Sequence, residues 1–369
     1  MKVPVCEPML NGKEKEFLLN CIESGWISSD GPCVKEFEAK FSNYIGSTHG
    51  IAVCNGTAAL SAAIFALDIR NGDEVIMPSF TIISCAISVI KFGGIPVLVD
   101  IEPETWNMDI TQVESKITNK TKAIMAVHMY GHPVDIDPLL VLAKKYNLYV
   151  IEDASQVHGA EYKGNKCGSL ADISTFSFYA NKILTTGEGG MVLTSNSTLA
   201  DRARNYRNLC FDAERKFIHK ELGDNLRITS MQAAVGLAQL ERIDEFVKIK
   251  RDNGKKYAER LADIPNLKIQ IEKPWAKMVY WMYCVQLSPN SGYGADGIRE
   301  KLAENGIATR AFFRGMHQQP ALLEAGLFKN SSYPVTEIAY KNGFYLPSSL
   351  SLTDSQIDYV VDHLKKLVV

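Results

Sequence analysis

The segment YANKILTTGEGGMV, residues 179–192, places Lys182 between an apolar run and a glycine-rich turn. A loop lysine is most often a solvated charge, but an amine held at a protein site forms a Schiff base with a carbonyl compound. Three glycines within four residues let the backbone pass close to a bulky neighbour, although their spacing is not the GxGxxG of a dinucleotide site. Lys182 is therefore either a surface charge or a reactive amine.

A carboxylate stands at a comparable position. Asp153 ends the apolar run LYVIED, and Gln156 follows it in EDASQ. A carboxylate at the end of a buried strand loses hydration, so it needs a cationic or hydrogen-bond-donating partner. The simpler interpretation of Asp153 is an N-cap for the next segment. Gln156 either contacts a ligand oxygen or lies at the surface.

The segment CNGTAAL is typical of an anion site at a helix N-terminus. Gly56 permits a tight turn from strand to helix, and Thr57 and Ala58 begin the helix. Free amides and the positive end of the helix dipole attract a phosphate there. Ser177, in STFSFYANK, is placed to reach the same phosphate. A plain strand-to-helix turn with a threonine cap explains CNGTAAL about equally well.

Taken together, these residues describe a single ligand. It has an aromatic ring with a phosphate arm, a basic ring nitrogen facing a carboxylate, and a carbonyl within reach of an amine. That combination is pyridoxal 5′-phosphate. The sequence predicts that Asp153 keeps the ring nitrogen protonated, which makes the ring an electron sink. Lys182 is predicted to form the Schiff base with the aldehyde and, once released, to move protons.

Short apolar strands and amphipathic helices alternate from about residue 50 to 195. Strands are expected at 50–56 with the exit turn, 73–79, 95–101, 122–130, 148–153, 171–179 and 189–195. Helices are expected at 57–67, 81–93 and 137–147. This rhythm predicts an α/β fold with a mostly parallel, doubly wound central sheet covered by helices. Ligands of such sheets bind at the carboxyl ends of the strands.

The second half of the chain predicts a separate, smaller unit. Apolar residues at helical spacing predict one long helix over 230–264, broken by proline and polar residues near 264–277. A strand and two helices follow, at 278–287, 297–306 and 353–368. We therefore expect a large domain that binds the cofactor, 1–250, and a small C-terminal α+β domain, 251–369.

Composition narrows the class of protein. The 369 residues are 46% hydrophobic and 22% charged, which is ordinary for a globular protein. A net charge of −2 with mixed signs gives no support for binding nucleic acid or a membrane surface. No run approaches a membrane span, and the N-terminus lacks the apolar core of a signal peptide. The eight cysteines show no CxxC spacing. We therefore expect a cytoplasmic enzyme with reduced thiols and no metal site.

At this point the chain resembles a known family. The runs FSFYANKILTTGEGGMV, EDASQ, NGTAAL and NLRITSMQAAVGLAQLERID are similar to the nucleotide-sugar aminotransferases, a branch of fold type I of the aspartate aminotransferase superfamily. The resemblance extends from GWISSDGP to YLPSSLSLTDSQID. It implies transfer of the amino group of L-glutamate to C4 of a nucleotide-linked 4-keto-6-deoxy sugar. GWISS, HMYGHPVDIDP, FSFYANK and YWMY are closest to members that convert GDP-4-keto-6-deoxymannose to GDP-perosamine, a step in lipopolysaccharide O-antigen biosynthesis.

The resemblance implies a role for each matching residue. Lys182 and Asp153 become the catalytic pair, and Gln156 faces the cofactor ring or its phenolic oxygen. Asn225 of the partner subunit would complete the phosphate site, so the family resemblance implies a homodimer with shared active sites. The phosphate itself would be held by the turn and the strand end already described, through Gly56, Thr57, Ala58 and Ser177.

The substrate pocket is less clearly marked. Trp26, Ser28 and Ser29 in GWISSDG combine an aromatic ring with hydroxyls, which suits a sugar nucleotide. Trp281 and Tyr283 in YWMY are similar candidates, and a place in the core is at least as good an interpretation of Trp281. His317 matches a family histidine expected to contact the sugar or the nucleotide. The alternative for His317 is an ordinary, partly buried histidine.

Departures from the family pattern leave the substrate open. Ile82 stands where many relatives stack an aromatic side chain on the ring. The GDP-perosamine-forming members usually carry glutamate at Gln156 and tend to have proline at Gly315. The same reaction on a UDP- or dTDP-linked sugar therefore remains an alternative. Lys182 argues against the dehydratases of the family, in which histidine replaces it. A non-catalytic regulatory protein of this fold, the other alternative, is expected to lack Lys182 or Asp153.

Overall fold

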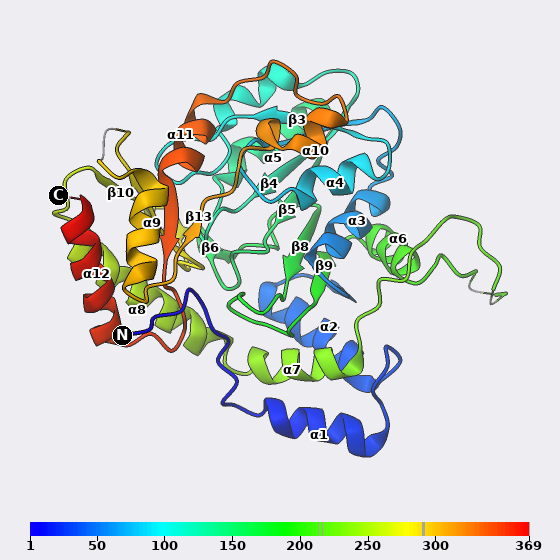
Figure 1. Ribbon diagram of the computed structural model, residues 1–369. Coiled ribbons are helices and arrows are strands. Elements are labelled where there is room, and N and C mark those ends of the chain that lie inside the picture. Colours follow the sequence, from blue (N-terminus) through cyan, green and yellow to red (C-terminus); the bar gives the residue numbers. More distant parts are fainter. Residues whose placement is uncertain (213, 216, 290–291, 369) are drawn as a thin grey trace.

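The computed structural model describes residues 1–369 except 213, 216, 290–291 and 369. Its centre is a seven-stranded sheet of order β1-β9-β8-β5-β4-β2-β3 (Figure 1). Among these strands β9 runs against its neighbours β1 and β8, and the other pairings are parallel. The predicted α/β class with a mostly parallel sheet is confirmed. The strands are β1 His49–Val53, β2 Glu74–Pro78, β3 Ile95–Val99, β4 Thr121–Val127, β5 Tyr149–Asp153, β8 Ile173–Ser177 and β9 Gly190–Thr194.

Helices pack on the sheet along their apolar faces. Helix α3, the alanine-rich segment Gly56–Ala66, lies against β8 and β9 and is buried almost all round. Alanine favours the helix because it loses no side-chain entropy there, and the Asn55 side chain caps its first turn. The neighbouring helices are α1 Glu14–Ser24, α2 Pro32–Ile45, α4 Ser84–Ile90, α5 Ile136–Tyr146 and α6 Ser197–Arg207, with short 3-10 turns at Ile110–Gln112 and Glu114–Lys116.

The C-terminal part forms a second layer beside the sheet (Figure 1). A second apolar cluster draws its buried residues from Tyr257 to Val368 and adds Val3 from the N-terminus. The division at residue 250 stays a prediction. The elements of this part are β10 Leu267–Ile269, β12 Tyr283–Leu287, β13 Arg310–Ala311, β14 Gly343–Leu346, α9 Gly294–Glu304, the 3-10 turn Met316–Gln318, α10 Pro320–Glu324, α11 Pro334–Asn342 and α12 Asp354–Val368. A small third sheet joins β6 Glu161–Tyr162, β7 Asn165–Lys166 and β11 Ala276–Lys277.

The prediction of one long helix over 230–264 is wrong. The structure has two helices, α7 Ser230–Leu240 and α8 Ile243–Leu261. The chain bends at Arg242, whose guanidinium donates to Asn11 Oδ1 at 2.6 Å and to Glu245 at the start of α8. Helix α7 packs against α1 and α2, whereas α8 runs on to pack against α12. A straight helix would not satisfy both contacts.

The strand expected at 278–287 begins only at Tyr283. Tyr280 has a φ of 46°, which an extended strand does not allow. The preceding Val279 donates its N–H to the carbonyl of Gly131 instead of joining the sheet. This bend brings Trp281 to the wall of the cavity described next. Among the described helices, none is long and apolar enough to cross a membrane.

Candidate active site

A cavity of about 520 Å³ opens where β1, β5 and β8 end. Six of the eight residues predicted to bind the cofactor line it together: Gly56, Thr57, Asp153, Gln156, Ser177 and Lys182. They come together because the carboxyl ends of parallel strands share one edge of the sheet. The other lining residues are Cys54, Asn55, Leu60, Ile82, Ser84, Ser155, Tyr179, Asn181, Glu188, Trp281, Phe313 and Tyr345. A larger hollow of about 710 Å³ beside α5 includes none of the predicted residues.

One end of the cavity is lined by hydroxyl groups at the N-terminus of α3. Thr57 Oγ1 lies 2.9 Å from Ser84 Oγ. A Cβ on Gly56 would stand 2.8 Å from the Cβ of Ser177, so only glycine lets the two segments approach this closely. Ala58 is buried, and its N–H is donated to Asn55 Oδ1 at 2.8 Å. This end offers hydroxyl donors and a helix N-terminus, as an anion requires.

A second polar group in the cavity, besides the hydroxyls at α3, is the Asp153 carboxylate, which is only 3% exposed. Its Oδ1 accepts the N–H of Ser155 at 3.1 Å, and its Oδ2 accepts the thiol of Cys85 at 3.4 Å. Burial and the charge of Asp153 raise the pKa of the Cys85 thiol well above its ordinary value. The thiol therefore stays protonated and remains a donor to the carboxylate.

Gln156 is oriented by the backbone behind it. Its Oε1 accepts the N–H of Tyr130 at 2.7 Å, so the amide NH₂ is the group left to face the cavity. A glutamate at this position would present an acceptor where glutamine presents a donor. The chain thus offers a hydrogen-bond donor beside Asp153, which suits a ligand oxygen.

Lys182 extends its amine across the face of Trp281, with Nζ 3.9 Å from the ring centroid. The indole of Trp281 is held in turn by donating Nε1–H to the carbonyl of Asn181 at 2.8 Å. Burial lowers the pKa of Lys182 to about 8, although the nearby Asp153 charge opposes the change. A useful fraction of this amine is therefore uncharged near neutral pH, as a nucleophile requires.

The glycine-rich turn after Lys182 serves the chain's own packing. A Cβ on Gly190 would stand 2.4 Å from the carbonyl oxygen of Asn55, and Gly187 has a φ of 80°. The close neighbour that Gly190 admits is thus the loop after β1. The turn brings the segment of Lys182 against the segment of Thr57.

Seven predicted residues do not line this cavity of their own chain: Ala58, the Tyr283 that is buried in β12, and five others. Asn225 and Ser28 are exposed, Trp26 is 50% exposed, and Ser29 is half-buried. His317 is 4% exposed, and its Nε2 lies 3.1 Å from Glu337 Oε1. Burial lowers the pKa of His317.

Several lining residues were not predicted from the sequence. Ser84 begins the helix that follows β2, so its place at a strand's carboxyl end was a usable indication. Phe313 and Tyr345 come from the C-terminal part, and their ring centroids lie 5.7 and 5.9 Å from that of Tyr130. No local pattern in the sequence indicates that these two rings reach the cavity.

The set of groups fits pyridoxal phosphate. It combines an amine of lowered pKa, a buried carboxylate, an amide donor and a hydroxyl-lined helix N-terminus in one cavity. The fold and the site together define an α/β enzyme of the pyridoxal-phosphate class.

Comparison with known proteins identifies the family. Residues 8–365 match the model of the DegT/DnrJ/EryC1/StrS aminotransferase family, and the chain belongs to that family. The predictions of an aminotransferase and of pyridoxal phosphate as its cofactor are confirmed.

This chain is similar to individual relatives over nearly their whole length. GDP-perosamine synthase of Caulobacter vibrioides is 41% identical, covering 100% of this chain and 99% of the relative. GDP-perosamine synthase of Escherichia coli O157:H7 is 40% identical, and the match covers 99% of this chain and 98% of the relative. The PLP form of Spr1654 from Streptococcus pneumoniae superposes with a TM-score of 0.93 at 26% identity, covering 100% and 99%.

Proposed function

We propose that this aminotransferase moves the amino group of L-glutamate to C4 of GDP-4-keto-6-deoxymannose and so makes GDP-perosamine. The observation that carries the proposal is the identity of 40 and 41% to two GDP-perosamine synthases over nearly the full length of both chains. Pyridoxal phosphate supplies the carbonyl that exchanges amino groups and the electron-withdrawing ring. A polysaccharide of the cell surface, such as an O-antigen, is the proposed destination of the sugar.

The proposed roles follow from the geometry of the cavity. The amine of Lys182 would hold the cofactor and, when free, would accept and return a proton. Its lowered pKa lets it accept that proton near neutral pH. The Asp153 carboxylate would pair with the protonated ring nitrogen, and the Gln156 NH₂ would donate to a ring oxygen. Trp281 lies against the amine and keeps it inside the cavity.

The phosphate arm is proposed to lie at the N-terminus of α3. Thr57 and Ser177 would donate their hydroxyls, while Gly56 leaves the room that a side chain would fill. Ser84 joins this set through its contact with Thr57. Ala58 would contribute only after Asn55 releases its N–H.

A homodimer with shared active sites is part of the proposal. Asn225 lies in a segment held beside the cavity wall, where Cys54 donates its N–H to Leu226 at 2.8 Å. The connection from α6 to α7 projects from the body (Figure 1) and exposes Phe217 by 75% and Leu222 by 92%. Exposed apolar side chains of this size favour burial against a second copy.

The location proposed for the enzyme is the cytoplasm. All eight cysteines are free thiols in the structure. Reduced thiols in a chain of this length are typical of a reducing compartment.

An amination panel tests the substrate. Purified protein with pyridoxal phosphate and L-glutamate is incubated separately with GDP-, UDP- and dTDP-linked 4-keto-6-deoxy sugars, and products are followed by mass spectrometry. Turnover confined to the GDP-mannose-derived ketone supports the proposal. Turnover only with a UDP- or dTDP-linked sugar would reject it and keep the chemistry. Binding of cofactor without amination of any sugar would favour the regulatory alternative.

Subunit mixing tests the shared site. Lys182→Ala and Asn225→Asp are each expected to be nearly inactive as pure dimers. If the partner supplies Asn225, mixed dimers contain one site with both defects and one intact site. Remixing equal amounts should then restore about a quarter of the native activity. No recovery, with subunit exchange shown by mass spectrometry, would place both residues in sites of a single chain.

A further inference from the structure

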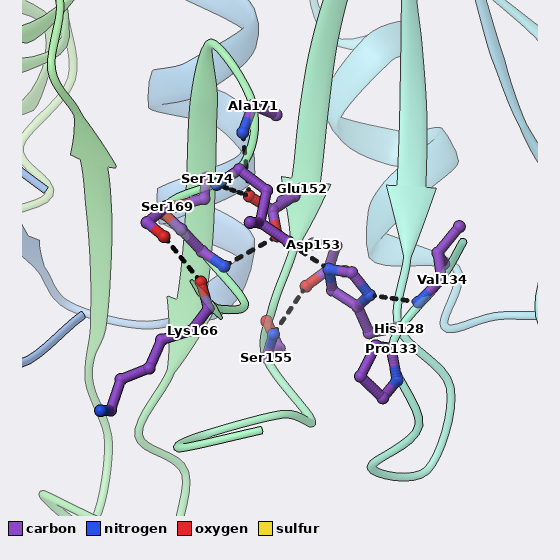
Figure 2. Close-up of polar contacts among 12 residues, drawn as sticks. His128, Pro133, Val134, Glu152, Asp153, Ser155, Lys166, Ser169, Ala171 and Ser174 are labelled. Carbon is purple, nitrogen blue, oxygen red and sulfur yellow. Dashed lines mark hydrogen bonds and ion pairs between the residues drawn. The ribbon is translucent and has the colours of Figure 1, made fainter. Parts of the chain in front are cut away.

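A buried acid–histidine pair lies behind the cavity, between β4 and β5 (Figure 2). Glu152 and His128 are both fully buried, and His128 Nε2 lies 3.0 Å from Glu152 Oε1. The other ring nitrogen, Nδ1, accepts the N–H of Val134 at 2.8 Å. Since Nδ1 is an acceptor, the proton of the neutral ring must be on Nε2. His128 therefore donates to Glu152, in a tautomer set by the backbone.

Three backbone donors complete the shell around Glu152. Its carboxylate accepts the N–H groups of Gly168 at 2.7 Å, Leu170 at 2.8 Å and Ala171 at 3.2 Å. With His128 this makes four donors for one anion, which offsets its loss of hydration. The carboxylate thereby ties β5 to the segment that leads into β8.

The same residues resemble a metal site by type, because the thiol of Cys167 lies close to both groups. The hydrogen bonds argue otherwise. The His128 nitrogens and both Glu152 oxygens are already engaged in the network above. Burial and the Glu152 charge raise the pKa of the Cys167 thiol well above its ordinary value, so it is no thiolate ligand. The cluster is therefore a hydrogen-bond network.

This network lies one residue from Asp153, on the opposite face of the strand. The carbonyl of Asp153 accepts the N–H of His128 at 3.2 Å. The loop that begins at His128 also supplies the Tyr130 N–H that orients Gln156. The pair therefore fixes the backbone that carries Asp153 and the backbone that orients Gln156. These are the two polar groups expected to face the ring of the cofactor.

We infer that Glu152 and His128 are positioning residues that aim the Asp153 carboxylate at the ring nitrogen of pyridoxal phosphate. The inference rests on the role proposed above for Asp153. Neither residue lines the cavity, so both act through the strand end. Loss of the pair should let the end of β5 shift and should weaken the contact between carboxylate and ring nitrogen.

Two variants separate this role from support of the fold. Glu152→Gln turns an NH₂ group toward donors that need an acceptor. His128→Asn keeps an oxygen near Nδ1 for Val134 but is too short to reach Glu152. Glu14→Gln is the matched control, because Glu14 is also buried and accepts from Gly12 N–H and Gln239 Nε2 far from the cavity.

The readout is the affinity of each protein for two probes. One is pyridoxal phosphate, and the other is its analogue with a C–H group in place of the ring nitrogen. Both test variants should bind pyridoxal phosphate about tenfold more weakly, the loss expected for a disturbed charge-assisted hydrogen bond. Their affinity for the analogue should stay within about twofold of the native affinity, because the analogue has no ring nitrogen for Asp153 to contact. The control should match the native protein with both probes.

Other outcomes would overturn the inference. An equal loss with both probes would mean that the pair only supports the fold, and no loss with either would mean that it does not position Asp153. If the native protein does not prefer pyridoxal phosphate to the analogue, the role of Asp153 itself fails. Melting curves check each fold, and His128→Asn carries the test if Glu152→Gln does not fold. A failed amination panel would reject the proposed substrate and leave these results unaffected.

Discussion

Lys182 should make the cofactor-free protein less stable than a variant with an uncharged side chain of similar length. Lys182→Met keeps the aliphatic stem and removes the ammonium. In the folded protein, burial lowers the pKa of Lys182 to about 8, whereas an unfolded chain restores the ordinary value of about 10.4. At about 1.4 kcal/mol for each tenfold change in proton affinity, the charged form costs about 3 kcal/mol of folding free energy.

The sign of the effect gives it a characteristic pH dependence. Between about pH 8 and 10.4 the unfolded chain holds the proton that the folded protein has lost, so the native stability rises with pH. Below pH 8 the full cost is present. The gain from Lys182→Met should therefore be largest at pH 7 and fade by pH 10. Because Lys182 as a residue is half-buried and its amine rests on Trp281, we expect a gain of about 1–3 kcal/mol at pH 7.

Urea unfolding of the two apoproteins at pH 7 and pH 10 measures this difference. Lys122→Met, at an exposed position on β4, is the control for replacing a lysine by methionine. The reasoning is refuted if the gain for Lys182→Met at pH 7 does not exceed that of the control. It is equally refuted if the gain is the same at both pH values.

Three further predictions concern the same cavity. Capture of pyridoxal phosphate by the apoprotein should speed up about tenfold per pH step below pH 8 and level off above it, because only the neutral amine of Lys182 attacks. Stopped-flow absorbance measures the profile, and a flat one would contradict the lowered pKa. Asp153→Asn removes the charge that raises the pKa of Lys182, so this profile should move to lower pH, while amination slows on the order of 100-fold. An unmoved profile would show that the two groups do not interact. Gly56→Ala should cost about 1–3 kcal/mol and weaken cofactor binding, since the new Cβ meets Ser177. If Gly56→Ala keeps the native Tm and the native Kd for pyridoxal phosphate, the turn accommodates the new Cβ without cost.

Much of the fold followed from local pattern. The apolar runs before Gly56, Asp153 and Ser177 each form a strand, because a strand buried on both faces needs a continuous apolar run. Once those strands are parallel, residues just after them meet at one sheet edge, and Lys182 meets them there too. The sequence alone therefore determined the class of fold, the position of the cavity and the cofactor that suits it.

Other features were decided only by tertiary contacts. The bend at Arg242 depends on Asn11, more than two hundred residues away, with no glycine or proline to mark it. Glu152 reads locally as one more residue of an apolar strand, and its donors become visible only when His128 after β4 and the segment before β8 surround it.

The state of the amine is the clearest case. The sequence by itself determined that Lys182 follows a strand at the ligand-binding edge. That it rests on Trp281 with a lowered pKa depends on a ring supplied from about a hundred residues away. Burial and charge are sums over spatial neighbours, which a one-dimensional pattern does not contain. The tertiary structure therefore decided that the pKa of this lysine is lowered.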